Sequence, residues 1–304
     1  MSVIEKIQVK PFLKWAGGKG QLISQMRAYF PGQLLNTGRM KSYFEPFLGG
    51  GAVFFRLASE FDFENIYLYE INPEVANCYR TIRNRINKLV GDLAELESEY
   101  LSKTEKKREA FYYARRTEYN ELILSKVVNN CVRKASLLVF LNKTCFNGLY
   151  RVNSKGEFNV PFGRYKNPTI CDEENLYAVK EVLKNAEIIN GDFSLCLRYA
   201  DSQSFVYFDP PYRPLSKTAS FTNYCQAVFS DSEQRRLKDV FDKLDKKGAL
   251  VMLSNSDPKN LDPKDNFFDD LYKKYKIVRL NATRMINCNA DKRGEIKEIL
   301  VRNY

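Results

Sequence analysis

The chain has 304 residues, of which 44% are hydrophobic and 28% are charged, and its formal net charge is +11. This composition is typical of a globular protein with a substantial core and excludes an intrinsically disordered chain. Histidine is absent, which excludes a histidine general base and a histidine-based metal site. The positive charge favours a polyanionic partner, although charge alone does not distinguish this from an ordinary solvated surface.

Neither a membrane segment nor a disulfide framework is indicated. No apolar run approaches the roughly 20 residues that span a bilayer, and Met1–Lys10 mixes charges with isolated hydrophobes. The seven cysteines are scattered without a Cys-x-x-Cys pair, so a disulfide framework and a zinc ribbon are both disfavoured. We therefore expect a cytoplasmic protein without membrane contact and without a metal.

The first predicted elements form a βαβ unit. A strand at Lys41–Phe47 runs into a glycine turn, a helix covers Ala52–Ser59, and a second strand at Asn65–Tyr69 ends at Glu70. Glycines after a first strand let the backbone approach a ligand closely, and an acid at the end of the second strand accepts hydrogen bonds from ribose hydroxyls. A ligand-free tight turn is the alternative.

The glycine turn departs from the dinucleotide-binding fingerprint. Gly49 and Gly51 fit G-x-G-x-x-G, but Phe54 occupies the third glycine position. A nucleoside ligand is therefore favoured over one with a pyrophosphate.

The middle third of the chain is basic and helical in pattern. From Glu74 to about Leu141 apolar residues recur at helical spacing, and Asn142–Pro168 is loop-like, rich in Asn, Gly and Pro. Residues 73–170 hold 18 Lys and Arg against 10 Asp and Glu, a net charge of +8, whereas the rest of the chain has +3. This is the distribution expected if the segment lies against phosphates.

Alternation of strands and helices resumes after residue 170. A capping box at Ser230 and Glu233 opens a helix that extends to about Lys246. The other predicted elements are a helix at Glu173–Asn185, strands at Ala186–Ile189, Ser204–Phe208 and Ala249–Leu253, and an edge hairpin of Tyr275–Leu280 and Ile296–Val301 with Asn287–Gly294 as its loop. We predict one α/β catalytic domain, 1–72 with 171–304, interrupted by a mostly helical domain at 73–170.

The tetrapeptide Asp209–Tyr212, Asp-Pro-Pro-Tyr, follows the predicted strand Ser204–Phe208. Open α/β sheets bind ligands at the carboxyl ends of their strands, although a rigid turn that ends a strand is the alternative. The lone pair of an exocyclic amino group is delocalised into the ring, and acceptors on both N–H bonds free it. Asp209 and the Pro210 carbonyl supply such acceptors, Pro211 makes the turn rigid, and Tyr212 offers a face for stacking. Transfer of an activated methyl group then needs no histidine, metal or covalent nucleophile.

A third motif lies near the N-terminus, at Phe12–Lys19. Its glycines indicate a loop, Lys19 is a candidate anion or base contact, and Trp15 is a candidate for stacking on an adenine ring. In isolation the segment is equally typical of a plain turn with an aromatic anchor.

Together the segments Trp15–Lys19, Phe44–Gly51 and Asp209–Tyr212 resemble the Dam family of DNA adenine-N6 methyltransferases, in the motif order of its α group. Cys145–Asn153 and Gly156–Tyr165 are similar to the segment through which that family reads GATC. The resemblance implies a Rossmann-like sheet of seven strands with an antiparallel edge hairpin and a mostly helical target-recognition insertion. It also implies S-adenosylmethionine (AdoMet) as the methyl donor without a metal, double-stranded DNA as the substrate, and a target adenine flipped out of the duplex.

The resemblance also assigns roles to individual residues. Arg151 is expected to read guanine by bidentate hydrogen bonds. Phe146, Asn147 and Leu149 are expected at or between the bases, with Pro161 and Tyr165 at the thymine and outer bases. Family members usually carry Asp where this chain has Glu70, which bears on affinity for ribose. The catalytic residues implied are Asp209, Pro210, Pro211 and Tyr212, and the AdoMet-binding residues implied are Trp15, Lys19, Glu45, Phe47, Gly49, Gly51, Glu70, Asp192, Phe193 and Asp209.

Other methyltransferases and an inactive DNA-binding protein remain as alternatives. Enzymes that act on cytosine N4 or on protein glutamine usually carry Ser or Asn, respectively, before Pro-Pro, and RNA adenine methylation is disfavoured by the recognition segment. An inactive regulator is disfavoured by the intact Asp209 and glycine turn. The sequence leaves open a cognate restriction endonuclease as a partner, and we expect a monomer.

Overall fold

The computed structural model describes residues 9–15, 17, 19–20, 22–125, 131–213, 229–283 and 295–304. The chain divides into two compact units. Unit 1 comprises Met1–Gly18, Gly49–Ser59 and Glu70–Asn190, and unit 2 comprises Lys19–Leu48, Glu60–Tyr69 and Gly191–Tyr304. Within the described ranges, no helix has the length and apolar character needed to cross a membrane.

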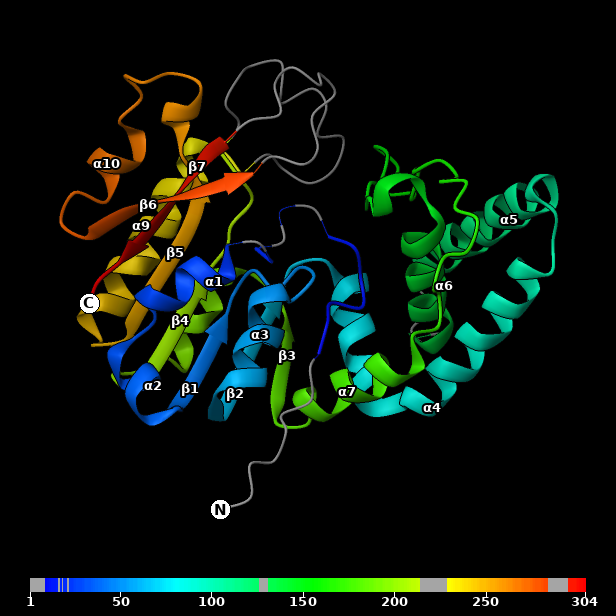
Figure 1. The fold of residues 1–304 in the computed structure, drawn as a ribbon, viewed down its shortest axis with the longest axis horizontal. Helices are drawn as coiled ribbons and strands as arrows, with labels where there is room; N and C mark the ends of the chain where they lie inside the picture. The colour runs from blue at the N-terminus through cyan, green and yellow to red at the C-terminus, as the bar shows by residue number, and fades with distance from the viewer. Residues whose placement is uncertain are drawn as a thin grey trace. The chain divides into compact units, whose positions relative to one another are not determined.

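The described strands form one mixed seven-stranded sheet in the order β3-β2-β1-β4-β5-β7-β6 (Figure 1). β1 pairs in parallel with β2 and β4, and β4 pairs in parallel with β5. β7 is antiparallel to both β5 and β6. This confirms the predicted α/β fold with an antiparallel pair at the sheet edge. The bounds are β1 Arg39–Glu45, β2 Asp62–Glu70, β3 Ala186–Asn190, β4 Ser204–Phe208, β5 Leu250–Ser256, β6 Lys276–Thr283 and β7 Glu295–Arg302.

The centre of the sheet is buried, as its apolar sequences require. All five residues of β4 are buried, and six of the seven residues of β5 are buried. A near-continuous apolar run is typical of a parallel strand covered on both faces. The first residue after β4 is Asp209, so the fold places this carboxylate at the carboxyl end of a central strand.

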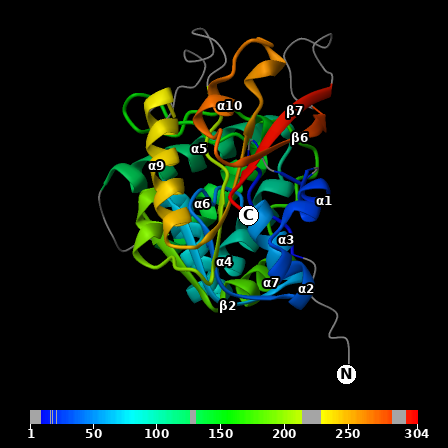
Figure 2. The ribbon, with the colours of Figure 1, turned by 90° about the vertical axis from the view of Figure 1, so that its left-hand side faces the viewer.

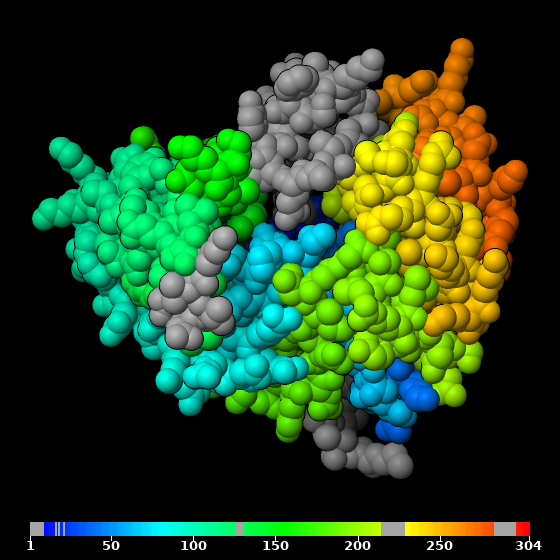
Figure 3. All heavy atoms as spheres, turned by 180° about the vertical axis from the view of Figure 1, so that it is seen from behind, coloured from blue at the N-terminus to red at the C-terminus, as the bar shows by residue number. Residues whose placement is uncertain are grey.

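Unit 2 has helices on both sides of its strands. Figure 2 shows α9 (Asp231–Lys246) on one side and α1 (Ile23–Met26) with α2 (Gly32–Thr37) on the other, and α10 (Phe267–Leu271) follows β5 along the chain. α9 buries an apolar stripe, and part of the helix reaches the surface in Figure 3, where it is yellow.

The start of α9 confirms one half of the predicted capping box. The Ser230 hydroxyl accepts a hydrogen bond from the Glu233 backbone N–H (3.4 Å). The Glu233 carboxylate pairs instead with Arg236, one turn further along the helix. The reciprocal bond of a full capping box is therefore replaced by an ion pair.

Unit 1 is mostly helical, as the periodicity of residues 74–141 predicts. α4 begins with a capped first turn, since Asn72 Oδ1 accepts from the Glu74 N–H (3.0 Å) and Pro73 occupies the first helical position. Residues Ala135–Leu141 of α6 are buried on all sides of the helix, which makes α6 the centre of this unit. The helices are α3 Ala52–Glu60, α4 Pro73–Leu101, α5 Glu105–Leu124, α6 Cys131–Thr144 and α7 Glu173–Leu183. The hairpin loop predicted at Asn287–Gly294 lies outside the described residues.

Candidate active site

Asp209 is held by side chains from distant parts of unit 2. The Lys19 ammonium donates to Asp209 Oδ1 (2.6 Å), and the Ser254 hydroxyl of β5 donates to the same oxygen (3.2 Å). Tyr207 in turn shares a 2.7 Å hydrogen bond with Ser254. Within the described part of the chain, no hydrogen bond reaches Asp209 Oδ2. The carboxylate is thus fixed through one oxygen and can accept through the other.

Lys19 is a buried cation among oxygen atoms. Its Nζ lies 2.6 Å from Asp209 Oδ1, 2.9 Å from the Tyr212 hydroxyl and 3.5 Å from Glu298 Oε2. Burial by itself lowers the pKa of Lys19, but Asp209, Glu298 and Tyr212 raise it further, so that the net pKa lies above its usual range. Lys19 therefore stays protonated.

Tyr212 has its hydroxyl fixed and its ring partly exposed. The hydroxyl donates to Glu298 Oε1 (2.7 Å) and accepts from Lys19. Burial and the nearby carboxylates raise the pKa of Tyr212 despite Lys19, so the hydroxyl keeps its proton. The side chain is 37% exposed, which leaves surface for stacking. Pro210 is buried, and the exposed Pro211 accepts a long bond from Gln234 through its carbonyl (3.4 Å).

An aromatic surface lies in the same unit. The Phe47 and Phe193 rings stack with centroids 5.1 Å apart. Asp192 caps the turn that begins at Phe193, and Arg236 binds both Asp192 oxygens (2.9 and 2.8 Å) while lying 4.1 Å from the Phe193 ring centroid. Hydrogen bonds from Arg236 lower the pKa of Asp192 to about 2. Glu45 is buried at the end of β1 and accepts a hydrogen bond from the Tyr43 hydroxyl.

In unit 1, Glu70 holds the glycine turn. Its Oε2 accepts from the Gly49 N–H (2.9 Å) and its Oε1 accepts from the Asn72 N–H (2.8 Å). Burial raises the pKa of Glu70, and these backbone N–H groups oppose the rise. Both oxygens are therefore occupied by backbone donors, a role that the sequence did not predict.

The turn tolerates no side chain at two of its glycines. Gly49 has φ +49°, and a Cβ there would lie 2.7 Å from the indole Nε1 of Trp15. Gly51 has φ +70°, and its Cβ would lie 2.7 Å from the Tyr79 hydroxyl. Glycine is thus required twice over, by backbone conformation and by space. The Trp15 ring also stacks on Tyr150, with centroids 5.9 Å apart.

The predicted recognition segment of unit 1 is a loop held by two isolated bridges, Cys145 with Phe162 and Val152 with Phe158. Phe146 is 51% exposed and Leu149 is 37% exposed, while Asn147 between them has φ 54°. The loop therefore exposes two large apolar side chains, Phe146 and Leu149, to solvent.

Arg151 is oriented by one neighbour in that loop. Its Nε donates to Asn159 Oδ1 (2.7 Å) and its Nη2 donates to the Asn159 carbonyl (3.2 Å). The Pro161 carbonyl accepts from the Phe146 N–H (2.9 Å). Local bonds thus orient Arg151, while Asn120 and Tyr112 of α5 hold the loop at Phe158 and Val160.

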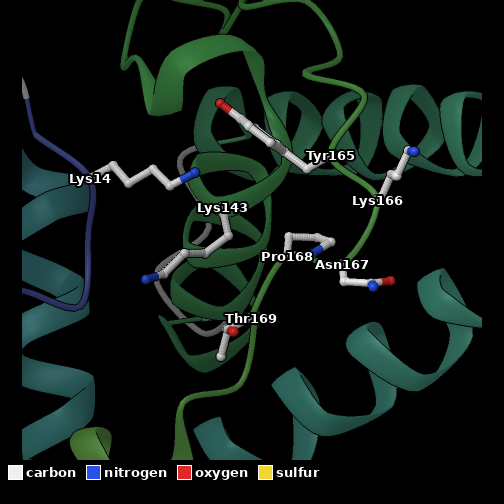
Figure 4. Close-up of a pocket in the computed structure, with 7 residues that line it drawn as sticks. All are labelled: Lys14, Lys143, Tyr165, Lys166, Asn167, Pro168 and Thr169. Atoms are coloured by element: carbon white, nitrogen blue, oxygen red, sulfur yellow. The ribbon is translucent and has the colours of Figure 1, made fainter.

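A basic pocket of about 400 Å³ lies beside the loop in unit 1 (Figure 4). Lys14 Nζ lies 4.2 Å from the Tyr165 ring centroid. Burial, together with Lys14, lowers the pKa of Lys143. The sequence did not single out Lys14, Lys143 or Lys166; the concentration of positive charge was its one signal. The lining residues are Lys14, Lys143, Tyr165, Lys166, Asn167, Pro168 and Thr169.

Glu298 and Ser254 are the site residues that sequence reasoning missed in unit 2. Glu298 lies on β7 and is buried together with Leu300, which is two residues further along the same strand. The neighbours Ile299 and Val301 are buried as well, so the alternation of faces along a strand does not mark Glu298 in the sequence. Among the described residues, no group of His, Cys, Asp or Glu could hold a metal ion.

Comparison with known proteins shows similarity along both units. The family of D12 class N6 adenine-specific DNA methyltransferases matches residues 15–286. A Type II methyltransferase of Methanocaldococcus jannaschii, M.MjaIII, is 49% identical over 98% of this chain and 100% of its own length. The Type II methyltransferase M1.LlaDCHI of Lactococcus lactis is 39% identical over 98% and 97%. The DNA adenine methylase of Escherichia coli is 33% identical over 96% and 94%.

Proposed function

The chain belongs to the D12 class of N6 adenine-specific DNA methyltransferases, and on that premise we propose that Asp209–Tyr212 transfers a methyl group from AdoMet to a flipped-out adenine in GATC. The observation that carries this proposal is the hydrogen bonding of the Asp209 carboxylate. Lys19 and Ser254 both bind Oδ1, so the carboxylate is held at the end of β4 with Oδ2 directed to no partner among the described residues.

The chemistry follows from this arrangement. Asp209 Oδ2 accepts one N–H of the adenine amino group, and the Pro210 carbonyl accepts the other. These two bonds free the nitrogen lone pair for attack on an electrophilic carbon. Tyr212 stacks on the base and keeps it in the orientation for attack. AdoMet, when bound, supplies a methyl group already activated on a sulfonium. Lys19 holds Asp209 Oδ1 in an ion pair (2.6 Å), which fixes the orientation of the carboxylate.

We assign AdoMet binding to the residues that the family resemblance implies, and each unit is considered by itself. In unit 2 the half-buried Phe47 ring, stacked on the buried Phe193 ring, is the aromatic group suited to a planar base. In unit 1 the Trp15 indole lies directly against the backbone of the Gly49 turn. Each Glu70 oxygen has a second lone pair, which allows a ribose hydroxyl to bind in addition to the backbone N–H. The assigned residues are Trp15, Lys19, Glu45, Phe47, Gly49, Gly51, Glu70, Asp192, Phe193 and Asp209.

Recognition of DNA is assigned to residues 73–170, as a target-recognition domain. Asn159 orients Arg151, which supports a bidentate contact with guanine. Exposed Phe146 and Leu149 suit insertion at the bases with Asn147, and Pro161 and Tyr165 complete the site. The lysines of the basic pocket suit the phosphate backbone.

The cellular setting is part of the same proposal. Two relatives carry the name Type II methyltransferase, which supports a restriction endonuclease of the same specificity as a partner. We expect the enzyme to act as a monomer in the cytoplasm.

The test is methylation of short duplexes with labelled AdoMet. A duplex that contains GATC is expected to take up label, and a duplex with the same composition and a scrambled site is not. Equal labelling of the two contradicts the proposed specificity, and labelling of neither contradicts the activity.

A further inference from the structure

Glu298 of β7 is a buried carboxylate within the group of side chains that surrounds Asp209. Its Oε1 accepts from the Tyr212 hydroxyl (2.7 Å), and its Oε2 lies 3.5 Å from Lys19 Nζ. Lys19 Nζ lies 2.6 Å from Asp209 Oδ1. One cation thus lies between two carboxylates, and Tyr212 bonds both to the cation and to one of the carboxylates. These four side chains come from three separated stretches of unit 2.

The charges of this group depend on one another. Burial raises the pKa of Glu298. Lys19 and the Tyr212 hydroxyl oppose this rise, Asp209 adds to it, and the net pKa lies above its usual value. Removal of Glu298 would take away one of the two carboxylates that lie near Lys19 in the described part of the chain, and a buried cation that loses a partner is less firmly held. Glu298 therefore helps to hold Lys19 where it binds Asp209.

The orientation of Tyr212 depends on Glu298 as well. The hydroxyl has one proton to donate, and the bond to Glu298 uses it, while Lys19 donates to the oxygen. The ring itself is partly exposed, so packing alone leaves it room to rotate about its side-chain bonds. Anchoring the far end of the side chain fixes the plane that faces the base.

From this geometry we infer that Glu298 is a positioning residue for methyl transfer, which holds the Tyr212 ring through its hydroxyl and the Asp209 carboxylate through Lys19. The inference rests on the proposed function, since it takes Asp209 and Tyr212 as the groups that meet the target adenine. Glu298 is assigned no contact with the base or the methyl donor, and its contacts are with Tyr212 and Lys19.

The test compares Glu298→Gln and Tyr212→Phe in the full-length enzyme, separately and together, in single-turnover methylation at saturating AdoMet and DNA. Loss of a hydrogen bond to a charged group is expected to lower the rate by about tenfold in each single variant. Glu298→Gln keeps an acceptor oxygen but removes its charge, and Tyr212→Phe removes the donor. The double variant is expected to be within about twofold of the slower single variant, because both changes remove the same charge-assisted bond.

A spectroscopic readout separates positioning from stability. A duplex with 2-aminopurine at the target adenine fluoresces when the base leaves the stack and is quenched when the base stacks on a ring. Both single variants are expected to give higher fluorescence than the wild type at an unchanged dissociation constant for DNA. Lys297→Gln, which removes an exposed charge from the adjacent position of β7, serves as the matched control and is expected to behave as the wild type.

Two outcomes overturn the inference. One is a wild-type rate and wild-type fluorescence for Tyr212→Phe, a variant that removes a single oxygen atom from a partly exposed side chain and so keeps the fold. The other is a double variant whose loss is the product of the two single losses. Asp209→Ala distinguishes these failures from failure of the proposed function: if Asp209→Ala is inactive while both variants are normal, the active site stands and the role of Glu298 does not.

Discussion

Asp209 and Arg151 are both charged side chains that we assign to the DNA, but their surroundings differ. Asp209 follows a buried strand and is bound by Lys19, which lies 190 positions away in the sequence. Arg151 lies on a loop and is held by Asn159, eight positions away. Asp209 is thus held by long-range contacts within unit 2, whereas Arg151 is held by a local contact within unit 1. Substitutions that weaken the contacts of Asp209 should slow the reaction, and substitutions at Arg151 should change which DNA is used.

The largest expected effect is that of Asp209→Ala. The variant loses the acceptor that activates the amino group, and we expect the single-turnover rate on GATC duplex to fall by about a thousandfold or more, as when one preorganised polar group is removed from an active site. Discrimination between GATC and scrambled duplex in binding should stay unchanged. Asp239→Ala, which removes an exposed carboxylate from α9, is the control. A reduction of less than about tenfold would contradict the role of Asp209 as acceptor.

Arg151→Ala should reduce the preference of the enzyme for GATC over other DNA sequences. Loss of a bidentate contact to guanine is expected to lower kcat/KM on GATC by about ten- to hundredfold and to have little effect on DNA with another base at that position. Steady-state methylation of the two duplexes measures the ratio. Lys155→Ala, an exposed change in the same loop, should affect both duplexes equally. A uniform loss for Arg151→Ala would indicate a phosphate contact in place of a base contact.

Gly49→Ala tests the local geometry of unit 1 outside the recognition loop. The new methyl group would contact Trp15 at 2.7 Å with φ at +49°, so the turn must shift, and we expect the dissociation constant for AdoMet to rise about tenfold. Calorimetric titration measures the constant. Gly20→Ala, where a Cβ meets nothing within 4 Å, is the control, and an unchanged constant for Gly49→Ala would remove the turn from the AdoMet site.

The smallest expected effect concerns the Asp192–Arg236 pair, which is partly exposed. Hydrogen bonds from Arg236 lower the pKa of Asp192 from 3.8 to about 2. The pair therefore stabilises the fold at pH values above the unfolded pKa and loses this contribution as pH falls towards about 2. We expect Asp192→Asn to lower the free energy of unfolding by less than about 1 kcal/mol near neutral pH, since solvent screens the pair.

Denaturant unfolding across that pH range checks the sign. The difference between wild type and Asp192→Asn should shrink as the solution is made acidic. A difference that grows towards low pH contradicts the assigned direction.

Much of the fold could be predicted because its elements have local signals. The apolar run Ser204–Phe208 matches β4 at both ends, and Ser230 marks the start of α9. The first strand was predicted at Lys41–Phe47 but lies at Arg39–Glu45. The reason is that Pro46 has no N–H to donate to a ladder, so the strand ends before it. The short helices α1, α2 and α10 were not predicted, since four to six residues carry too little periodicity to stand out.

The site could be predicted only where a motif carries it. Asp209 and Tyr212 lie together in one tetrapeptide, and the structure brings Lys19 to both. Glu298 belongs to no motif, and its relevance depends on Tyr212 and Lys19 meeting it in the fold. Long-range contacts of this kind have no signature in the local sequence. Glu70 was expected at ribose, and its bonds to Gly49 and Asn72 depend equally on the folded turn.

The most direct measurement of the central claim is the identity of the methylated nucleoside. GATC duplex is incubated with AdoMet and either the wild type or Asp209→Ala, digested to nucleosides, and analysed by mass spectrometry. The account predicts N6-methyladenine from the wild type and none above background from Asp209→Ala over the same time. N6-methyladenine from Asp209→Ala at the wild-type rate, or a methyl group on another base, would contradict it.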